Sequence, residues 1–350
     1  MLVPDGNGGI NRLFQQLQRH RGAGVKTCLT LFDSTDKRTL KVLRFPWRVA
    51  RFLLATRGGT FQLCHINLST GGSALRKVIY AALCRSIGLP YVIHLHGGLY
   101  REFYAGLPGP FQAAIRDLFL KAKRVIVLGT VWRDFVISEI GVEPDRAVIL
   151  PNAVSGPVDF KAHSQSESLH LLFLGKIGPM KGTPELLQAL ADPEFQELAW
   201  TATIAGDGAV EEFRSAVAKA GFGARIEVPG WVGPEEVEAL LARSDILMLP
   251  SHVENLPLSM LEGMANGLCP VVTPVGAVPD VIRDEENGLL VPVNDAAALT
   301  HAIVRLIEDR DLLVRLSANA RRDFEAHYDI RNYRQKLETV YLDASQVQHT

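Results

Sequence analysis

The stretch Ser251-His-Val-Glu-Asn-Leu-Pro-Leu-Ser-Met-Leu-Glu-Gly-Met-Ala-Asn-Gly267 follows the apolar run Asp245-Ile-Leu-Met-Leu-Pro250. The run predicts a buried strand, the proline-interrupted segment after it predicts a loop, and Leu258–Asn266 predicts a short helix that the next glycine ends. A strand, a loop and a helix in this order form the repeating unit of a doubly wound α/β sheet. Glu254 then precedes the helix, and Glu262 lies inside it.

A loop beyond the carboxyl end of a buried strand is where open α/β sheets bind ligands. The helix that follows points free N–H groups and a positive dipole end at this position, which suits a phosphorylated ligand. Carboxylates would repel a phosphate, so we expect Glu254 and Glu262 to accept hydrogen bonds from hydroxyls, such as those of a ribose and a sugar. The pattern favours a sugar nucleotide; alternatively, Glu254 caps the helix and Glu262 is a solvated helical residue.

Length, charge and cysteine content limit the class of protein. At 350 residues the chain is long for one hydrophobic core, so we expect two domains. Its 37 basic and 38 acidic residues leave a net charge of −1, which does not favour nucleic-acid binding. The sequence contains no C-x-x-C pair, so it favours buried thiols in a reduced cytosolic chain over a zinc site or a disulfide framework. The cysteines are Cys28, Cys64, Cys84 and Cys269.

Short β-branched runs alternate with longer amphipathic segments in both halves, which predicts parallel strands joined by crossover helices. In the first half we expect strands at Val25–Phe32, Phe61–Asn67, Tyr91–His96, Arg124–Leu128 and Ala147–Leu150. In the second half we expect them at Leu169–Leu174, Trp200–Ala205, Arg225–Val228, Asp245–Leu249, Val271–Thr273 and Leu289–Val291. The sequence therefore predicts two doubly wound parallel-sheet domains that face each other across a cleft.

The domain boundaries follow from a segment rich in proline, glycine and serine, residues 151–168. We expect an N-terminal domain at 1–153, a linker at 154–168, a C-terminal domain at 169–325 and a last helical segment at 326–350 that packs back toward the N-terminal domain. Only Met1–Pro4 precedes the first glycine turn, where a central strand should supply about five or six residues. We expect either a translation start placed too late or an unusually short strand.

The segment Leu174-Gly-Lys-Ile-Gly-Pro-Met-Lys-Gly182 directly follows the first predicted strand of the second domain. Backbone N–H groups at Gly175 and the neighbouring glycines can approach a diphosphate there, while Lys176 and Lys181 neutralise it. The segment lacks the G-x-x-x-x-G-K-[ST] pattern of a P-loop. The alternative is a lysine-bearing surface turn.

Two further glycine turns follow predicted strands. Gly206-Asp-Gly208 begins like the dinucleotide-binding pattern G-x-G-x-x-G, but Glu211 occupies the third glycine position, so the pattern is incomplete. Gly8 and Gly9 belong to a turn near the start of the chain that carries no lysine. This first turn either brings backbone close to a ligand across the cleft or is simply tight.

His94 and His96 end the strand predicted at Tyr91–His96, and side-chain alternation places both on one face, with His96 nearer the crevice. An imidazole there can hydrogen-bond a hydroxyl of a donor or acceptor sugar. The pattern favours this role for His96 and a core position for His94.

Residues 70–77 follow the strand predicted at Phe61–Asn67 and open a helix. Ser73 is a candidate helix cap, and together with the cations Arg76 and Lys77 it is a candidate residue of a second anion-binding site. Such a site would suit a phosphorylated acceptor. The alternative is a capped helix with solvated basic residues.

Residues 37–54 interleave six cations with aromatic and leucine side chains and contain no acidic residue. Basic residues attract anionic lipids and aromatic residues settle at the interface, so this segment predicts docking on an anionic membrane surface. A packed helix with a basic outer face is the alternative. No apolar run reaches the about 18 residues of a spanning helix, and a signal-peptide pattern is absent, so we expect a soluble or peripheral protein.

The string Asp309-Arg-Asp311 matches a D-x-D metal-binding pattern. It lies between helical segments near the C-terminus rather than after a strand, so we interpret it as a coincidence. We expect no metal and no other cofactor.

Several motifs together closely resemble the family 4 retaining glycosyltransferases, which have the GT-B fold of two Rossmann-like domains. The resemblance spans Leu171 to about Val291 in the order and spacing of the family. It is carried by residues 175–182, Gly206-Asp-Gly208, Gly230-Trp-Val232, Asp245–Ser251 and the E-x7-E pair Glu254/Glu262. The Gly8-Gly9 and His96-Gly-Gly98 regions also look like family counterparts.

By that resemblance, Glu254 would contact the donor sugar, Glu262 the ribose hydroxyls and Lys181 the diphosphate. Lys176 stands where the family usually has arginine, and so keeps the charge without the bidentate geometry. His96 would help to position the reacting sugars. The remaining donor-binding residues would be Gly8, Gly9, Gly175, Gly206, Asn255, Leu256, Pro257 and Leu258, of which Asn255 replaces a frequent glycine.

The implied reaction transfers a sugar with retention from a UDP- or GDP-linked donor, with Lys181, Lys176 and the helix end stabilising the leaving diphosphate. Residues 65–77 with Val92–His96 look like bacterial exopolysaccharide transferases that extend polyprenyl-diphosphate-linked sugars. This implies a lipid-linked oligosaccharide acceptor at the cytoplasmic face of the cell membrane. The alternatives are a transferase with a soluble acceptor and a non-catalytic sugar-nucleotide-binding subunit. The incomplete glycine pattern disfavours a dehydrogenase.

Overall fold

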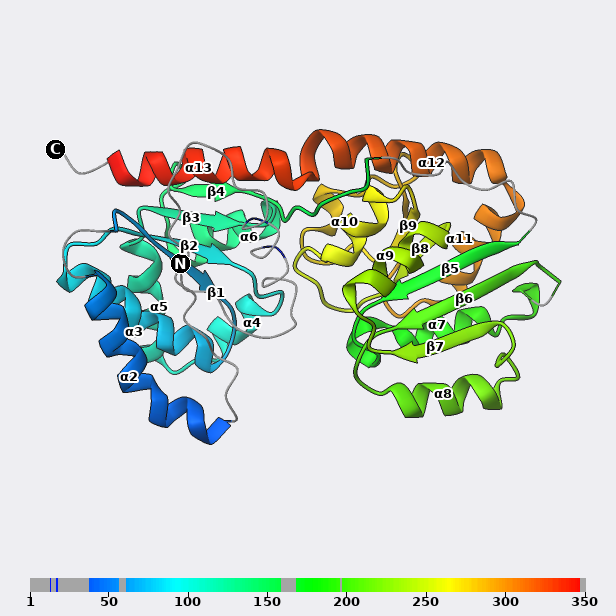
Figure 1. Cartoon of the computed structure of the whole chain (residues 1–350), viewed down its shortest axis with the longest axis horizontal. Helices are drawn as coiled ribbons and strands as arrows, with labels where there is room; N and C mark the ends of the chain where they lie inside the picture. The colour runs from blue at the N-terminus through cyan, green and yellow to red at the C-terminus, as the bar shows by residue number, and fades with distance from the viewer. Residues whose placement is uncertain are drawn as a thin grey trace. The chain divides into compact units, whose positions relative to one another are not determined.

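The computed structural model describes residues 38–56, 61–158, 168–195 and 197–346, together with Leu13 and Leu17, which are helical and buried. The chain divides into two compact units (Figure 1). The first contains Met1–Asn152 and Ile330–Thr350, and the second contains Ala153–Asp329. The C-terminal helix therefore belongs to the same unit as the N-terminal half of the chain.

The first unit contains a parallel sheet whose four described strands follow the order β1-β2-β3-β4. The strands are β1 (Cys64–Leu68), β2 (Tyr91–Leu95), β3 (Arg124–Val127) and β4 (Ala147–Ile149). The helices described in this unit are α2 (Arg38–Thr56), α3 (Gly72–Ser86), α4 (Tyr100–Ala105), α5 (Gly109–Leu120), α6 (Thr130–Phe135), a π-helical turn (Val136–Ile140) and α13 (Ile330–Gln346). Helix α13, drawn in red in Figure 1, contacts β2.

The second unit contains a six-stranded parallel sheet with the order β10-β9-β8-β5-β6-β7. Its strands are β5 (Leu169–Leu174), β6 (Trp200–Ala205), β7 (Ile226–Gly230), β8 (Ile246–Leu249), β9 (Cys269–Val272) and β10 (Leu289–Leu290). Its helices are α7 (Thr183–Leu190), α8 (Val210–Lys219), α9 (Pro234–Arg243), α10 (Leu258–Ala265), α11 (Ala296–Glu308) and α12 (Arg310–Asp323). Single helical turns occur at Pro179–Lys181, Pro193–Phe195, Val278–Asp280 and Phe324–Tyr328.

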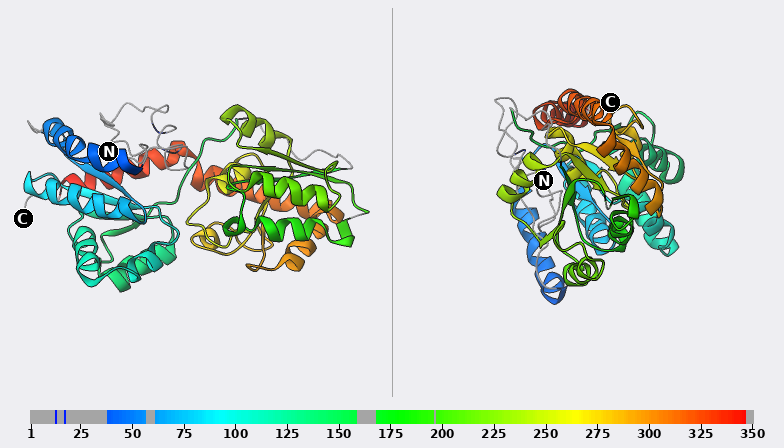
Figure 2. Two further views of the ribbon diagram at one scale, coloured as in Figure 1. Left: turned by 90° about the horizontal axis from the view of Figure 1, so that it is seen from below. Right: turned by 90° about the vertical axis from the view of Figure 1, so that its right-hand side faces the viewer.

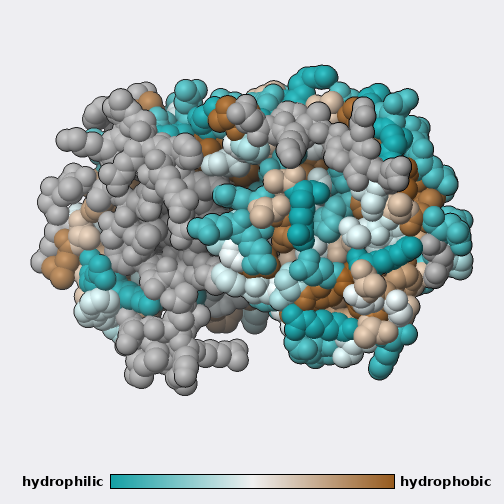
Figure 3. Space-filling model, turned by 45° about the vertical axis from the view of Figure 1, so that its right-hand side comes forward, coloured by the Kyte–Doolittle hydropathy of each residue, from teal (hydrophilic) through white to brown (hydrophobic). Residues whose placement is uncertain are grey.

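Apolar runs form these strands because helices cover both faces of each sheet (Figures 1 and 2). Every residue of β1, β2, β8 and β9 is buried. The surface of the second unit seen in Figure 3 mixes hydrophilic and hydrophobic residues. The hydrophobic cores therefore lie between the sheets and their helices.

The strands predicted within the described residues are confirmed, with ends that shift by at most three residues. The strand predicted at Val25–Phe32 lies outside the described residues, as do Gly8, Gly9 and Cys28. The other three cysteines are buried free thiols, as predicted. The helix predicted at Leu258–Asn266 is confirmed as α10, and Gly267 after it has a φ of 75°.

The order of the second sheet changes direction at β5, which lies between β8 and β6. From β5 the chain adds β6 and β7 on one side, and then crosses to add β8, β9 and β10 on the other. Loops that leave the carboxyl ends of β5 and β8 therefore depart in opposite directions and open a crevice, the usual ligand position in such sheets. Both sequence motifs of the predicted donor site lie in these two loops.

Candidate active site

The backbones of the loops after β5 and β8 contact each other directly. The amide of His252, after β8, donates to the carbonyl of Met180, after β5, at 3.1 Å. Gly182 has a φ of +67°, and a Cβ there would lie 1.9 Å from the carbonyl oxygen of Pro250. Only glycine fits this contact, so the glycine-rich segment and the loop that carries Glu254 form one structure.

Lys181 and Glu254, which are far apart in the sequence, form an ion pair in this structure. The hydroxyl of Ser251 donates to the same carboxylate oxygen of Glu254, Oε1, at 2.9 Å. The hydroxyl of Thr273 in turn donates to the carbonyl of Ser251. These contacts fix the carboxylate of Glu254, and its Oε2 accepts no hydrogen bond from the described residues.

The turn after β6 packs against the glycine-rich segment without intervening side chains. A Cβ at Gly206 would lie 1.7 Å from the carbonyl oxygen of Gly175, and one at Gly208 would lie 2.3 Å from that of Ile177. The amide of Ile177 donates to the carbonyl of Asp207 at 2.6 Å. This close packing explains why the first two glycines of a dinucleotide pattern occur here without the third. Lys176 is exposed beside this turn.

Helix α10 places Glu262 within the second unit. The helix begins after Pro257 and has no side-chain cap, so the alternative that Glu254 caps it is wrong. Glu262 is 8% exposed, so the alternative of a solvated helical residue is also wrong. A Cβ at Gly263 would lie 2.8 Å from a methyl carbon of Leu247 in β8, so the helix packs closely on the strand that leads into the loop.

The segment after β9 packs against the backbone of the loop that carries Glu254. Gly276 has a φ of +59°, and a Cβ there would lie 2.4 Å from the carbonyl oxygen of Glu254. The amide of Ala277 donates to the carbonyl of Asn255 at 2.7 Å. This support was not predicted from the sequence, although a glycine shortly after a predicted strand was a visible signal.

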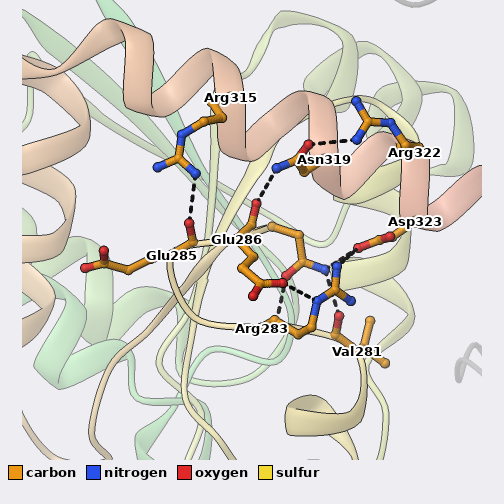
Figure 4. Close-up of polar contacts among 9 residues, drawn as sticks. Val281, Arg283, Glu285, Glu286, Arg315, Asn319, Arg322 and Asp323 are labelled. Atoms are coloured by element: carbon orange, nitrogen blue, oxygen red, sulfur yellow. Dashed lines mark hydrogen bonds and ion pairs between the residues drawn. The ribbon is translucent and has the colours of Figure 1, made fainter.

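The same segment continues into a loop that is tied to α12 by a polar network (Figure 4). Asn287 is 0% exposed and accepts a hydrogen bond from the amide of Arg283 at 2.7 Å. Its amide group donates to the carbonyl of Val281 at 2.9 Å and to Asp323 at 2.6 Å. Arg283 also pairs with Asp323 at 2.9 Å. The network holds the supporting segment on the body of the second unit.

A second contact near the loops, between His252 and Glu185, was also not predicted from the sequence. The Nε2 atom of His252 lies 3.2 Å from a carboxylate oxygen of Glu185, which is in the first turn of α7. The imidazole and the carboxylate are both partly buried. No motif in the sequence connects these residues, and their contact adds a link between the loop after β8 and the helix after β5.

In the first unit, His96 follows the end of β2 and is half-buried. Its Nε2 lies 2.9 Å from Oδ1 of Asn67, and its ring contacts that of His94 with 3.9 Å between centroids and a tilt of 37° between the ring planes. Burial lowers the pKa of His96 to about 3, so the ring is neutral at neutral pH. His94 is 0% exposed, which confirms its predicted core position.

The predicted helix cap at Ser73 is wrong. Gly71 occupies the N-cap position with a φ of 71°, and Ser73 lies in the first turn of α3. Glycine adopts a positive φ without strain, so the helix begins directly after Gly71. A cap at Ser73 would have placed its start two residues later. Lys77 is only 6% exposed, and its burial, followed by repulsion from Arg76, lowers its pKa to about 8. The anion-binding role of these two cations stays a prediction.

Within the described residues, no group of three or more His, Cys, Asp or Glu side chains is arranged to hold a metal ion. Asp309 of the D-x-D string caps α12, accepting a hydrogen bond from the amide of Leu312 at 2.9 Å. In the same part of the chain, no helix is both long and apolar enough to span a bilayer.

The sequence matches two family models in succession. Residues 4–153 match the glycosyl transferase 4-like domain, and residues 157–323 match the glycosyl transferases group 1. WcaL of Escherichia coli, named as a colanic acid biosynthesis glycosyltransferase, is 25% identical over 84% of this chain and 81% of its own length.

A relative from Campylobacter jejuni is 30% identical over 57% of this chain and 55% of its own length. It is named as an N-acetyl-D-galactosaminyltransferase acting on a PP-undecaprenol-linked saccharide. HepE of Anabaena, solved with UDP-glucose, superimposes with a TM-score of 0.73 at 19% identity, over 97% of this chain and 91% of that one. The two family models lie end to end along the chain and both sheets are parallel, as predicted, so the protein belongs to the group 1 glycosyltransferases and has the GT-B fold.

Proposed function

We propose that this chain is a retaining, metal-independent glycosyltransferase of bacterial exopolysaccharide or surface-glycan synthesis. It transfers a sugar from a UDP- or GDP-linked donor to a hydroxyl of a polyprenyl-diphosphate-linked oligosaccharide. The observation that carries the proposal is the ion pair between Lys181 and Glu254 at the point where the strand order of the second sheet reverses. One cation and one fixed carboxylate side by side suit a diphosphate joined to a sugar.

Cationic and N–H groups would bind the diphosphate of the donor, and carboxylates would bind its hydroxyls. Lys181, Lys176 and the first N–H groups of α10 would hold the diphosphate, because a helix N-terminus and ammonium groups favour phosphate oxygens. The Oε2 atom of Glu254 would accept a hydrogen bond from a sugar hydroxyl, and Glu262 from the ribose hydroxyls. The backbone of residues 255–258 and the glycines 175 and 206 would lie against the donor.

In the proposed reaction the acceptor hydroxyl attacks the anomeric carbon on the face from which the diphosphate leaves. The bond between the anomeric carbon and the phosphate oxygen breaks, the new glycosidic bond forms, and a phosphate oxygen takes the hydroxyl proton. Lys181 and Lys176 would stabilise the charge that develops on the leaving group, as preorganised electrostatic catalysis requires. His96 would position a sugar rather than remove the proton, because its pKa is about 3.

The proposed acceptor and location rest on the C. jejuni relative's named substrate and on α2. One face of α2 packs on α3, where Phe52 meets the ring of Tyr80 at 5.3 Å. Trp47 and Leu54, seven residues apart, are 59% and 64% exposed. Arg51 lies between them in the sequence, with its guanidinium 4.9 Å from the Trp47 ring. A helix with such a face suits an anionic membrane surface at the cytoplasmic side.

Donor turnover tests the enzyme proposal. We expect one donor in a panel of UDP- and GDP-sugars to be consumed with membrane lipid extract. Lys181→Ala should lower kcat by roughly a hundredfold or more, because it removes charge stabilisation of the leaving group. Glu262→Ala should weaken nucleotide binding, measured by calorimetry. Lys219→Ala, at an exposed lysine in the last turn of α8, is the matched control. Binding of a donor without turnover on any acceptor would instead indicate a non-catalytic subunit.

Vesicle flotation tests the membrane proposal. The chain should float with vesicles that contain anionic lipid and not with neutral ones. Combined Trp47→Ser and Arg51→Gln should abolish flotation and leave turnover of a water-soluble acceptor unchanged. Trp231→Ser, at a tryptophan that is 61% exposed in the second unit, is the control for loss of any exposed indole. Equal flotation of all variants, or none, would favour a soluble acceptor.

A further inference from the structure

Four side chains of the first unit form a continuous hydrogen-bonded chain that ends at His96. The hydroxyl of Tyr341, in α13, lies 2.7 Å from Nδ1 of His65. The Nε2 atom of His65 lies 3.2 Å from Oδ1 of Asn67. The same Oδ1 lies 2.9 Å from Nε2 of His96. Residues from distant parts of the sequence thus contact one another through specific atoms, and each of these contacts involves a ring nitrogen.

The register of the sheet explains why these residues meet. His65 and Asn67 are alternate residues of β1, so their side chains lie on one face. Asn67 pairs with His94 of the neighbouring strand β2, and His96 follows two residues later. Asn67 is 2% exposed and His65 is 3% exposed, so their hydrogen bonds are shielded from water. A shielded chain of hydrogen bonds strongly favours one arrangement of protons.

The side-chain amide of Asn67 determines which ring nitrogens of His65 and His96 carry the protons. The Oδ1 atom of Asn67 only accepts hydrogen bonds, so both His65 and His96 must present Nε2–H to it. In a neutral imidazole the other nitrogen then carries a lone pair. The Nδ1 atom of His65 uses its lone pair to accept from the hydroxyl of Tyr341. The Nδ1 atom of His96 has no hydrogen-bond partner within the described part of the chain.

The rings stay neutral because their surroundings disfavour charge. Burial lowers the pKa of His65 and of His96 to about 3, and burial raises the pKa of Tyr341 well above its usual value. The ring of His94, which is 0% exposed, packs against that of His96 with 3.9 Å between centroids. The rings of His65 and His96 therefore each carry one proton at neutral pH, and that proton is directed at Asn67.

We propose that Asn67 is a positioning residue that holds His96 in its Nε2–H tautomer, so that Nδ1 of His96 is presented as a hydrogen-bond acceptor for a sugar hydroxyl. The proposal rests on the proposed function, in which His96 contacts a reacting sugar. It adds the direction of the hydrogen bond: the sugar donates and the imidazole accepts. His96 orients the hydroxyl, and Asn67 acts through His96.

The tautomer can be measured without any activity. In histidine-labelled protein, nitrogen-15 shifts separate a protonated from an unprotonated ring nitrogen. We expect His96 to show Nε2–H in the unchanged chain and in Asn67→Asp, which keeps an acceptor oxygen. In Asn67→Leu a substantial Nδ1–H population should appear. A predominant Nδ1–H form of His96 in the unchanged chain, or an unaltered tautomer in Asn67→Leu, would overturn the proposal whether or not the chain is an enzyme.

Kinetics supply the second measurement. Asn67→Leu should lower kcat by roughly tenfold to a hundredfold through misorientation of the sugar, and leave the affinity for the nucleotide of the donor unchanged within about twofold because the proposed nucleotide site lies in the second unit. Asn67→Asp should recover most of kcat and add an acid limb to its pH profile, because a carboxylate raises the pKa of His96. Full activity in a folded Asn67→Leu, checked by thermal unfolding, would contradict the positioning role. Absence of turnover in the unchanged chain would contradict the proposed function and leave the tautomer measurement to decide.

Discussion

At the scale of single residues, the proposed donor site depends on glycines at positions where a Cβ atom would clash with the backbone of another loop. Gly182, Gly206 and Gly276 each have a positive φ, and a Cβ added at any of them would lie within 2.4 Å of a backbone oxygen. Their loops can therefore approach one another closely enough for Lys181 to reach Glu254. The chemistry of the site thus rests on residues that have no side chain.

Gly206→Ala tests this dependence. An added Cβ would lie 1.7 Å from the carbonyl oxygen of Gly175, and the φ of +153° is strained for an L side chain. We expect a loss of about 3 kcal/mol or more in the free energy of unfolding, and loss of binding of the donor nucleotide, measured by urea titration and calorimetry. Gly223→Ala is the control, because a Cβ there meets nothing within 4 Å; it should be neutral or stabilise by up to about 1 kcal/mol. Similar losses in both variants would refute the argument.

At the scale of elements, the periodicity of apolar residues predicted the strands and helices whose bounds depend on the local sequence. Strands β5 and β6 have the predicted bounds, and α10 begins where Leu258 resumes the apolar pattern. The cap at Ser73 was predicted wrongly because local pattern does not reveal that Gly71 adopts a positive φ. Contacts between distant segments, such as Asn287 with Asp323, depend on tertiary packing and left no periodic signal.

Arg321 illustrates such a contact and supports the helix that carries Glu262. It is 7% exposed, and its guanidinium donates to the carbonyl of Ala265 at the end of α10 and to that of Pro157 at 3.0 Å. It also pairs with Glu325 at 2.7 Å. One side chain therefore joins α12, α10 and the segment that enters the second unit.

Arg321→Gln should remove the hydrogen bonds and the ion pair that the guanidinium makes. Buried carbonyls that lose a charged donor cost about 1–3 kcal/mol each, so we expect a loss of roughly 2–4 kcal/mol in unfolding free energy. The affinity for the donor nucleotide should fall as well, because α10 loses the hydrogen bond that holds its end. The neighbouring Arg322 is exposed and bonds to Asn319, so Arg322→Gln should change stability by less than about 0.5 kcal/mol. Chemical unfolding and calorimetry of the two variants give the comparison, and equal effects would show that Arg321 is no anchor.

At the scale of the whole molecule, the two units differ in how they carry charge. The second unit places an ion pair between its loops, that of Lys181 with Glu254. The first unit instead gathers three histidines on one face of its sheet, the buried His65 and His94 and the half-buried His96. Sequence alone predicted His94 for the core and His96 for the site, but it did not predict that His96 and His65 bond to the same asparagine. The two units should therefore respond differently to acid.

The expected difference has a definite sign. Burial lowers the pKa of His65 and of His96 to about 3, and that of His94 well below 6.5. An unfolded chain protonates these histidines as the pH falls below about 6.5, whereas the folded unit does not until about pH 3. Their contribution to stability is therefore complete above pH 6.5 and declines between pH 6.5 and 3, by up to about 1.4 kcal/mol per pH unit for each histidine.

Hydrogen exchange at pH 7.5 and pH 5, corrected for the intrinsic exchange rate, measures this decline in each unit of the intact chain. Protection of β1 and β2 should fall much more than protection of β5, because ordinary carboxylates titrate mainly below pH 5. His94→Leu should reduce the fall and cost little at pH 7.5, since the ring of His94 is buried and neither of its nitrogens has a partner within the described residues. An equal loss of protection in both units, or an unchanged decline in His94→Leu, would mean that the buried histidines do not govern the acid response.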